Sequence, residues 1–354
     1  MNRLPLELPR KFSNHSTSVR RIVACSLLLV FVLSDRTKTA FADEPLGLPE
    51  VTHPPDNAPT PEKIALGKQL FFDMRLSSDG RVSCATCHDP QRGFGGAEPF
   101  SEGVDEQRVG RHTPILINVA LQKTQMWDGR AKTLEKQVLW PLQAPGEMNM
   151  PLKQAVSVLN GIDGYRTQFR RVFNTDATGD GLTKAIAAYE RTLLSGDAPY
   201  DRYQTGDDRH GMSESAVRGM KLYFFKANCK ECHRPPNFTN DQFHNIGLRS
   251  KDQEPDKDAG RVLISGKEAD TAAFKTPTLR DIKLSAPYMH DGSMTTLEEV
   301  VEHYNKGGNP HPQLDIDMVP LNLTDEEQVD LIAFLKEGLS GRITPDTSKP
   351  TLPK

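Results

Sequence analysis

The pentapeptide Cys-x-x-Cys-His occurs twice, as Cys-Ala-Thr-Cys-His over residues 84–88 and as Cys-Lys-Glu-Cys-His over residues 229–233. This spacing is the attachment signature of c-type haem. Two thiols three residues apart can reach both vinyl groups of one porphyrin, and the histidine that follows can become the proximal ligand of the iron. The sequence therefore predicts two covalently bound haems c, held by Cys84, Cys87, His88, Cys229, Cys232 and His233.

Two other kinds of site could use the same cysteines: one zinc ion held by both pairs, or two thioredoxin-like redox motifs. The zinc site leaves both histidines unexplained. The redox motifs need a strand–helix–strand context that the sequence lacks. Haem attachment is therefore the better explanation of the two motifs.

The first 42 residues have the pattern of a secretory signal peptide. Arg20 and Arg21 precede a short apolar run over residues 22–33, and Ala-Phe-Ala over residues 40–42 is a suitable cleavage site. The apolar run is too short to span a bilayer, although an uncleaved anchor is the alternative. We expect cleavage after residue 42, no membrane span in the mature chain and a periplasmic location, where bacteria attach haem covalently.

The composition argues against a nucleic-acid partner and for a thin core. The net charge is −3, and no basic cluster occurs outside the leader. Hydrophobic residues make up 36% of the chain, which also contains 26 glycines and 26 prolines. Long loops are therefore expected, and two buried porphyrins would supply much of the missing apolar surface.

A weak internal repeat surrounds the two haem motifs. Gly-Lys-Gln-Leu-Phe-Phe over residues 67–72 precedes the first motif, and Gly-Met-Lys-Leu-Tyr-Phe over residues 219–224 precedes the second. A further helix follows each motif, near residues 185–191 and 330–336. Glycine on one helix would let the other approach closely, as in the helix crossing of cytochrome c domains.

The repeat predicts a mainly α fold with two cytochrome-c-like haem domains and long irregular loops. Thr60 with Pro61 marks the start of the first helix, and the capping box Thr324-x-x-Glu327 marks the start of the last. We place the N-terminal domain at residues 55–205, the C-terminal domain at residues 206–342 and a flexible tail at residues 343–354.

The distal ligand of each haem decides between an electron carrier and a catalyst. Past the first motif, Met148 and Met150 have the spacing of an axial methionine, but Glu147 beside them could serve as an acid–base group for peroxide. Spacing alone leaves both functions open.

Past the second motif, Met289 and Met294 have similar spacing. Tyr304 lies further on, in a helix opened by Thr296-x-x-Glu299, on the same face as Leu297 and two valines. Its position is equally compatible with a packed core tyrosine.

Further motifs resemble those of the bacterial di-haem cytochrome c peroxidase/MauG family. They are Phe-Phe-Asp-x-Arg-Leu-Ser at 71–77, Trp-Asp-Gly-Arg-Ala at 127–131, Phe-His-Asn-Ile-Gly at 243–247, Lys-Thr-Pro-Thr-Leu-Arg at 275–280 and Pro-Tyr-Met-His-Asp-Gly at 287–292. The resemblance implies a peroxidatic haem in the N-terminal domain, an electron-transfer haem in the C-terminal domain and a calcium ion between them.

The resemblance also implies roles for individual residues. The catalytic glutamate of the family falls on Glu147, the tryptophan between the haems on Trp127, and two distal-pocket residues of the MauG branch on Gln137 and Pro141. The loop over residues 89–111 has no histidine to cap the first haem. Tyr304 falls on the second haem's axial position, where tyrosine marks the MauG branch, whose members oxidise residues of a partner protein.

For calcium, the resemblance points to the backbone carbonyls of Ser285 and Pro287. The third ligand of the family is an asparagine side chain, and His112 stands in its place. An imidazole is a poor ligand for a hard cation that prefers oxygen.

The sequence thus predicts a di-haem enzyme that reduces hydrogen peroxide at the N-terminal haem. It would take electrons from a small periplasmic redox protein, or oxidise a partner protein, through the C-terminal haem. The alternative is a di-haem electron carrier without catalytic activity. An open first iron would indicate the enzyme, and a Met148 or Met150 ligand the carrier.

Overall fold

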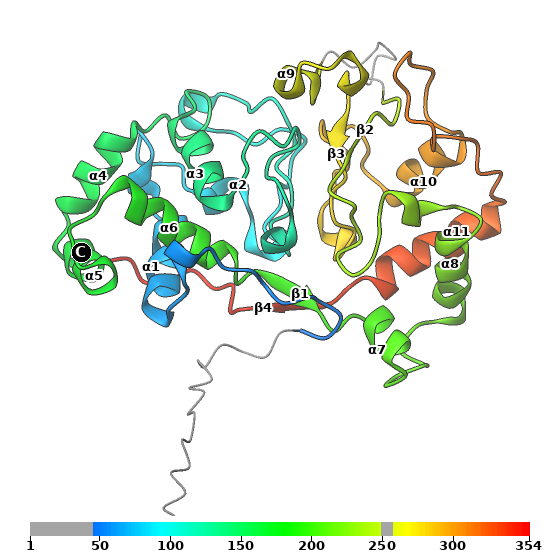
Figure 1. Ribbon diagram of the computed structural model, residues 1–354, viewed down its shortest axis with the longest axis horizontal. Helices are drawn as coiled ribbons and strands as arrows, with labels where there is room; N and C mark the ends of the chain where they lie inside the picture. Colours follow the sequence, from blue (N-terminus) through cyan, green and yellow to red (C-terminus); the bar gives the residue numbers. More distant parts are fainter. Residues whose placement is uncertain (1–44, 249–257) are drawn as a thin grey trace, which may run out of the picture. The chain divides into compact units, whose positions relative to one another are not determined.

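The computed structural model describes residues 45–248 and 258–354, so the expected signal peptide lies outside the described residues. The chain is mainly helical, with long irregular segments between the helices (Figure 1). Its helices are α1 (Pro61–Phe71), α2 (Cys84–Cys87), α3 (Leu134–Gln143), α4 (Leu152–Asn160), α5 (Asp163–Phe173), α6 (Gly179–Glu190), α7 (Pro199–Thr205), α8 (Glu214–Phe224), α9 (Val262–Ser265), α10 (Leu297–Asn305) and α11 (Asp325–Ala333). The strands form two antiparallel pairs, β1 (Leu194–Gly196) with β4 (Arg342–Thr344), and β2 (Phe243–His244) with β3 (Phe274–Lys275).

In the first half of the chain, α1 crosses α6 at a glycine. The helix begins as predicted, because the Thr60 side chain accepts a hydrogen bond from the backbone N–H of Lys63 at 3.2 Å. A Cβ added to Gly67 would lie 1.9 Å from the backbone oxygen of Ala185. Only glycine allows the two helices to approach this closely.

The second half repeats this crossing with α8 and α11. A Cβ added to Gly219 would lie 1.8 Å from the backbone oxygen of Asp330. The side chain of Asp330 also accepts a hydrogen bond from Arg218 at 2.7 Å, which ties the two helices together. The internal repeat is therefore confirmed as two equivalent helix crossings.

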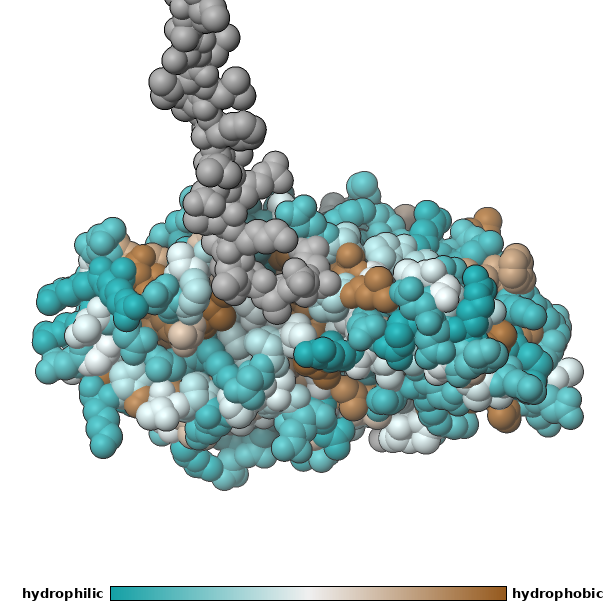
Figure 2. Space-filling model, turned by 90° about the horizontal axis from the view of Figure 1, so that it is seen from below, coloured by the Kyte–Doolittle hydropathy of each residue, from teal (hydrophilic) through white to brown (hydrophobic). Residues whose placement is uncertain are grey.

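Each crossing carries its own apolar core. Four residues after each glycine, an aromatic ring meets a second ring from the partner helix or its end. The ring centroids of Phe71 and Tyr189 are 5.4 Å apart, and those of Tyr223 and Phe334 are 5.3 Å apart. Hydrophilic side chains cover most of the face seen in Figure 2, so the limited apolar content is concentrated inside. No described helix has the length and apolar character needed to cross a membrane.

The boundary between the two halves does not coincide with a break in packing. Helix α7 precedes the predicted boundary at residues 205 and 206, yet it packs on the second core: the ring of Tyr200 stacks on that of Phe224, with centroids 6.0 Å apart. The division into residues 55–205 and 206–342 stays a prediction.

The tail over residues 343–354, predicted to be flexible, is bound to the first half. Its β4 strand pairs with β1, and further along the Pro353 oxygen accepts a hydrogen bond from Arg75 at 3.0 Å. The Lys354 oxygen accepts one from Gly164 at 3.2 Å. A proline-rich composition says nothing about backbone partners supplied by distant residues, and the flexibility of the tail stays a prediction.

Candidate active site

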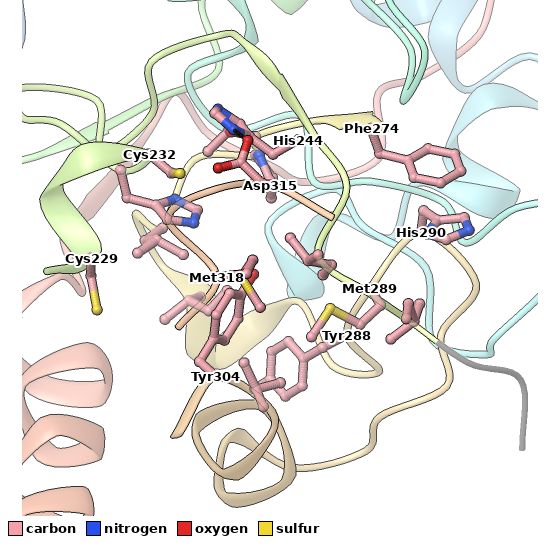
Figure 3. A pocket seen from close by; sticks show the side chains of 18 of the residues that line it. Cys229, Cys232, His244, Phe274, Tyr288, Met289, His290, Tyr304, Asp315 and Met318 are labelled. Carbon is pink, nitrogen blue, oxygen red and sulfur yellow. Dashed lines mark hydrogen bonds and ion pairs between the residues drawn. The ribbon is translucent and has the colours of Figure 1, made fainter. Parts of the chain in front are cut away.

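Each haem motif opens onto a cavity of its own. The first cavity, of about 420 Å³, is lined by the thiols and imidazole of residues 84–88. The second, of about 230 Å³, is lined by those of residues 229–233, and Figure 3 shows its labelled side chains around the open space. Paired thiols with a following histidine at the wall of each cavity are the donor set that a c-type haem requires. The residues therefore fit two haems.

The two motif histidines have the same orientation. Nδ1 of His88 lies 2.7 Å from the Phe94 oxygen, and Nδ1 of His233 lies 3.0 Å from the Phe238 oxygen. A carbonyl can only accept, so Nδ1 donates and Nε2 keeps its lone pair for a metal. Burial lowers the pKa of each histidine to about 4, which keeps the ring neutral. Both rings are thus prepared as iron ligands.

The predicted peroxidatic residues meet at the first cavity. Glu147, Gln137 and Pro141 all line it, with Gln137 and Pro141 on α3. Burial raises the pKa of Glu147, and the nearby positive charge of Arg130 opposes the shift. A carboxyl with a raised pKa beside a cavity is a suitable proton carrier.

The two candidate methionines beside Glu147 differ in position. Both are buried in the first apolar core, but only Met148 also lines the first cavity. Met148 is therefore the only one of the two that remains in place to act as an axial ligand.

Trp127 lies between the two cavities and lines both. Its indole N–H donates to the His112 oxygen at 2.8 Å, and its own carbonyl accepts from the backbone N–H of Lys275 at 2.7 Å. Its ring meets the ring of His290 edge to face, with centroids 6.4 Å apart. The indole is thus held in position from both halves of the molecule.

Tyr304 lines the second cavity from α10, which begins at the predicted capping box of Thr296 and Glu299. Figure 3 shows its ring directed toward the open space, near Met318 and Met289. Burial raises the pKa of Tyr304, and among the described residues no group hydrogen-bonds to its hydroxyl. An uncommitted hydroxyl at a cavity wall is available to a metal.

Two methionines also line the second cavity. Met289 was predicted as a candidate ligand, and Met318 was not. Met294, like Met289, packs against the second core, but it does not line the cavity. Met318 lies further along the sequence from the second haem motif than an axial methionine usually does. For that reason the sequence did not point to it.

The residues implied for calcium do not fit that ion. Ser285 and Pro287 lie in one loop, but the place of the third ligand is filled by the His112 ring, whose Nδ1 lies 3.0 Å from the Glu98 oxygen. Calcium takes 6–8 oxygen ligands, and an imidazole supplies none. No acidic cluster compensates, since residues 45–248 and 258–354 contain no group of three or more His, Cys, Asp or Glu side chains arranged to hold a metal.

Two buried charged side chains at the cavities were not anticipated. Glu190 lines the first cavity with its Oε2 atom unpartnered, and burial raises its pKa to about 8. Lys275 lines both cavities, donates to the Thr124 oxygen at 2.6 Å and to the Gln122 side chain, and has a pKa lowered to about 8 by burial. The sequence offered one sign of Glu190: it is a charged residue directly after the apolar run Ala-Ile-Ala-Ala-Tyr.

Comparisons with known proteins agree with this geometry. The family described as di-haem cytochrome c peroxidase matches residues 61–209. The methylamine utilization protein MauG of Methylorubrum extorquens is 43% identical over 81% of this chain and 80% of its own length. The cytochrome c551 peroxidase of Nitrosomonas europaea is 35% identical over 84% of this chain and 86% of its own.

A solved structure of a related protein also resembles this fold. The crystal structure of a MauG-like protein associated with microbial copper homeostasis has a TM-score of 0.78 and 33% identity, covering 85% of this chain and 95% of that one. With sequence and fold in agreement over most of the length, the chain belongs to the di-haem cytochrome c peroxidase/MauG family and is a haem-dependent, peroxide-using oxidoreductase.

Proposed function

We propose that the chain is a periplasmic enzyme that reduces hydrogen peroxide at the cavity of residues 84–88 and exchanges electrons with a protein partner through the cavity of residues 229–233. One observation carries the proposal: Trp127 lines both cavities, whereas Glu147 and Gln137 line only the first. The groups that can carry protons line only the first cavity, and the Trp127 indole connects it to the second. This arrangement suits peroxide reduction at the first haem site and electron exchange at the second.

Both haems are attached through the cysteine pairs, with His88 and His233 as proximal ligands. Bound haem supplies the iron at which peroxide is reduced and the electrons are stored. The chain supplies the rest. Two thiols and one carbonyl-anchored imidazole hold each porphyrin.

Proton movement at the first cavity is assigned to Glu147. Its carboxylate takes the proton from one peroxide oxygen and, as a carboxylic acid, returns it to the other. Burial raises the pKa of Glu147, so at a given pH more of this carboxyl is protonated than in a surface glutamate. The Gln137 amide lines the same cavity and can both donate and accept, so it can orient peroxide for this transfer.

Electron exchange with the second haem is assigned to Trp127, and the distal ligand there to Tyr304. The support for Tyr304 is its uncommitted hydroxyl at the cavity wall. A tyrosine ligand favours oxidation of a partner protein over acceptance of electrons from a small redox protein. The higher identity to MauG than to the cytochrome c551 peroxidase points the same way.

The test is Glu147→Gln in the holoprotein, which keeps the shape and removes the titratable group. General acid–base catalysis contributes about 10²–10⁴-fold, so peroxide turnover should fall by that order while the resting haem spectra stay unchanged. Glu106→Gln, at an exposed glutamate of the loop before Trp127, is the matched control. Unaltered turnover in Glu147→Gln would exclude the role, and haem lost to acid–acetone extraction would exclude covalent attachment.

A further inference from the structure

His112 joins the two halves of the molecule through its backbone. Its N–H donates to the His290 oxygen at 2.7 Å, and its oxygen accepts the indole N–H of Trp127 at 2.8 Å. The residue also lines both cavities. Any group that fixes His112 therefore fixes the indole between the two haem sites.

The His112 ring is enclosed by backbone carbonyls from both halves. The side chain is only 3% exposed, and its Nδ1 lies 3.0 Å from the Glu98 oxygen. Burial lowers the pKa of His112, and the nearby backbone carbonyls of Glu98, Pro99 and Ser285 oppose this shift. The ring is closely packed, since a Cβ added to Gly96 would lie 3.3 Å from its Cε1 atom.

Converging carbonyl oxygens need a positive partner. All of them can accept hydrogen bonds, and burying an acceptor without a partner is unfavourable. A calcium ion would satisfy them, but only with several more oxygen ligands and with space for the ion. A neutral imidazole has one N–H, so the ring can donate to one of these oxygens, here the Glu98 oxygen at Nδ1, and the ring already occupies the space.

We propose that the His112 imidazole replaces the calcium ion that the family resemblance implies between the two domains. The ring donates from Nδ1 to the Glu98 oxygen and lies beside the Ser285 carbonyl, and the same residue's backbone holds Trp127 and the His290 loop. His112 is thus a positioning residue, and the holoenzyme keeps its inter-haem geometry without calcium.

The experiment compares wild-type holoprotein with His112→Asn, which restores a side-chain oxygen and empties part of the ring's space. Metal content after gel filtration, calcium titration calorimetry and Tm in EGTA or millimolar calcium are measured. The wild type should hold no stoichiometric calcium and have the same Tm in both solutions. His112→Asn should have a lowered Tm in EGTA that calcium raises by about 5–10 °C, the size expected for ligand well above its Kd.

A matched control is His303→Asn, because His303 is another largely buried histidine whose ring contacts one carbonyl, the Ile246 oxygen at 2.9 Å. This variant should not respond to calcium. One calcium ion per wild-type chain, or a wild-type Tm lowered by EGTA, would overturn the proposal. So would a folded His112→Asn that ignores calcium, and if that variant does not fold, the wild-type metal content and the longer amide of His112→Gln decide the matter.

Discussion

The two halves of the molecule present the same cysteine and histidine donors to their cavities and differ in the other residues that line them. Gly67 and Gly219 allow equivalent helix crossings, and His88 and His233 each have Nδ1 on a carbonyl. The first cavity then receives polar groups from α3 and the turn after it, whereas the second receives a tyrosine from α10. Under the proposed function, the repeated part serves haem attachment, and the unrepeated part gives one site its chemistry and the other its electron exchange.

A second difference lies on the crossing helices themselves. Glu190 follows Tyr189 on α6, and Leu335 follows Phe334 at the matching position after α11. Each lines its own cavity. The first half therefore buries a carboxyl where the second half buries an aliphatic side chain. Replacing Glu190 by leucine would make the first half match the second at this position.

The largest expected effect comes from making the second site resemble a carrier. In Tyr304→Met a neutral thioether replaces the phenol oxygen, and axial ligands set haem potentials over a range of about 0.8 V. The potential of the low-spin haem should rise by a few tenths of a volt, measured by spectroelectrochemical titration. The physical reason is that an anionic ligand stabilises oxidised iron more than a thioether does.

Tyr304→Phe supplies the complementary measurement. The low-spin EPR signal of the resting protein should change, because the ligand is lost. Tyr288→Phe removes a hydroxyl from the same cavity and should leave the signal as it is. If Tyr304→Phe also leaves it unchanged, the ligand is one of the two methionines at this cavity, Met289 or Met318.

The next effect concerns the buried carboxyl of the first half. Burial raises the pKa of Glu190 from 4.5 to about 8, so the folded protein keeps this proton where the unfolded chain has lost it. Stability from this group is full below about pH 4.5 and is lost as pH rises toward 8. At 1.36 kcal/mol per pKa unit, the loss is on the order of 3–5 kcal/mol.

Glu190→Leu, which copies the second half, should remove this part of the pH dependence and stabilise the protein near pH 8. Denaturant unfolding at several pH values, followed by circular dichroism, measures the slope. Glu214→Gln, at an exposed glutamate of α8, should keep the wild-type slope. A slope that persists in Glu190→Leu would assign it to other groups.

Local sequence patterns predicted the elements that depend on local chemistry. The haem motifs, the capped starts of α1 and α11 and the two glycine crossings follow from short spacings, and each is present. The features that were missed depend on distant partners. Met318 reaches the second cavity from a loop without periodicity, and Lys275 lines both cavities although it is distant in sequence from Gln122 and Thr124, to which it donates.

The tail is the clearest case of this limit, and it gives the smallest expected effect. It begins in the second half and binds the first, through β4 on β1 and through the Arg75 and Gly164 hydrogen bonds. Ending the chain after Thr344 keeps the strand pair and removes the later contacts. Net hydrogen bonds contribute about 0.5–1.5 kcal/mol each, so Tm should fall by a few degrees with both haem spectra unchanged. Arg75→Lys weakens the pair with Asp73 in both chains and the hydrogen bond to Pro353 only in the full chain, so it should lower Tm more in the full chain than in the shortened one. A full-length Tm equal to that of the shortened chain would show that the tail contributes nothing to the first half.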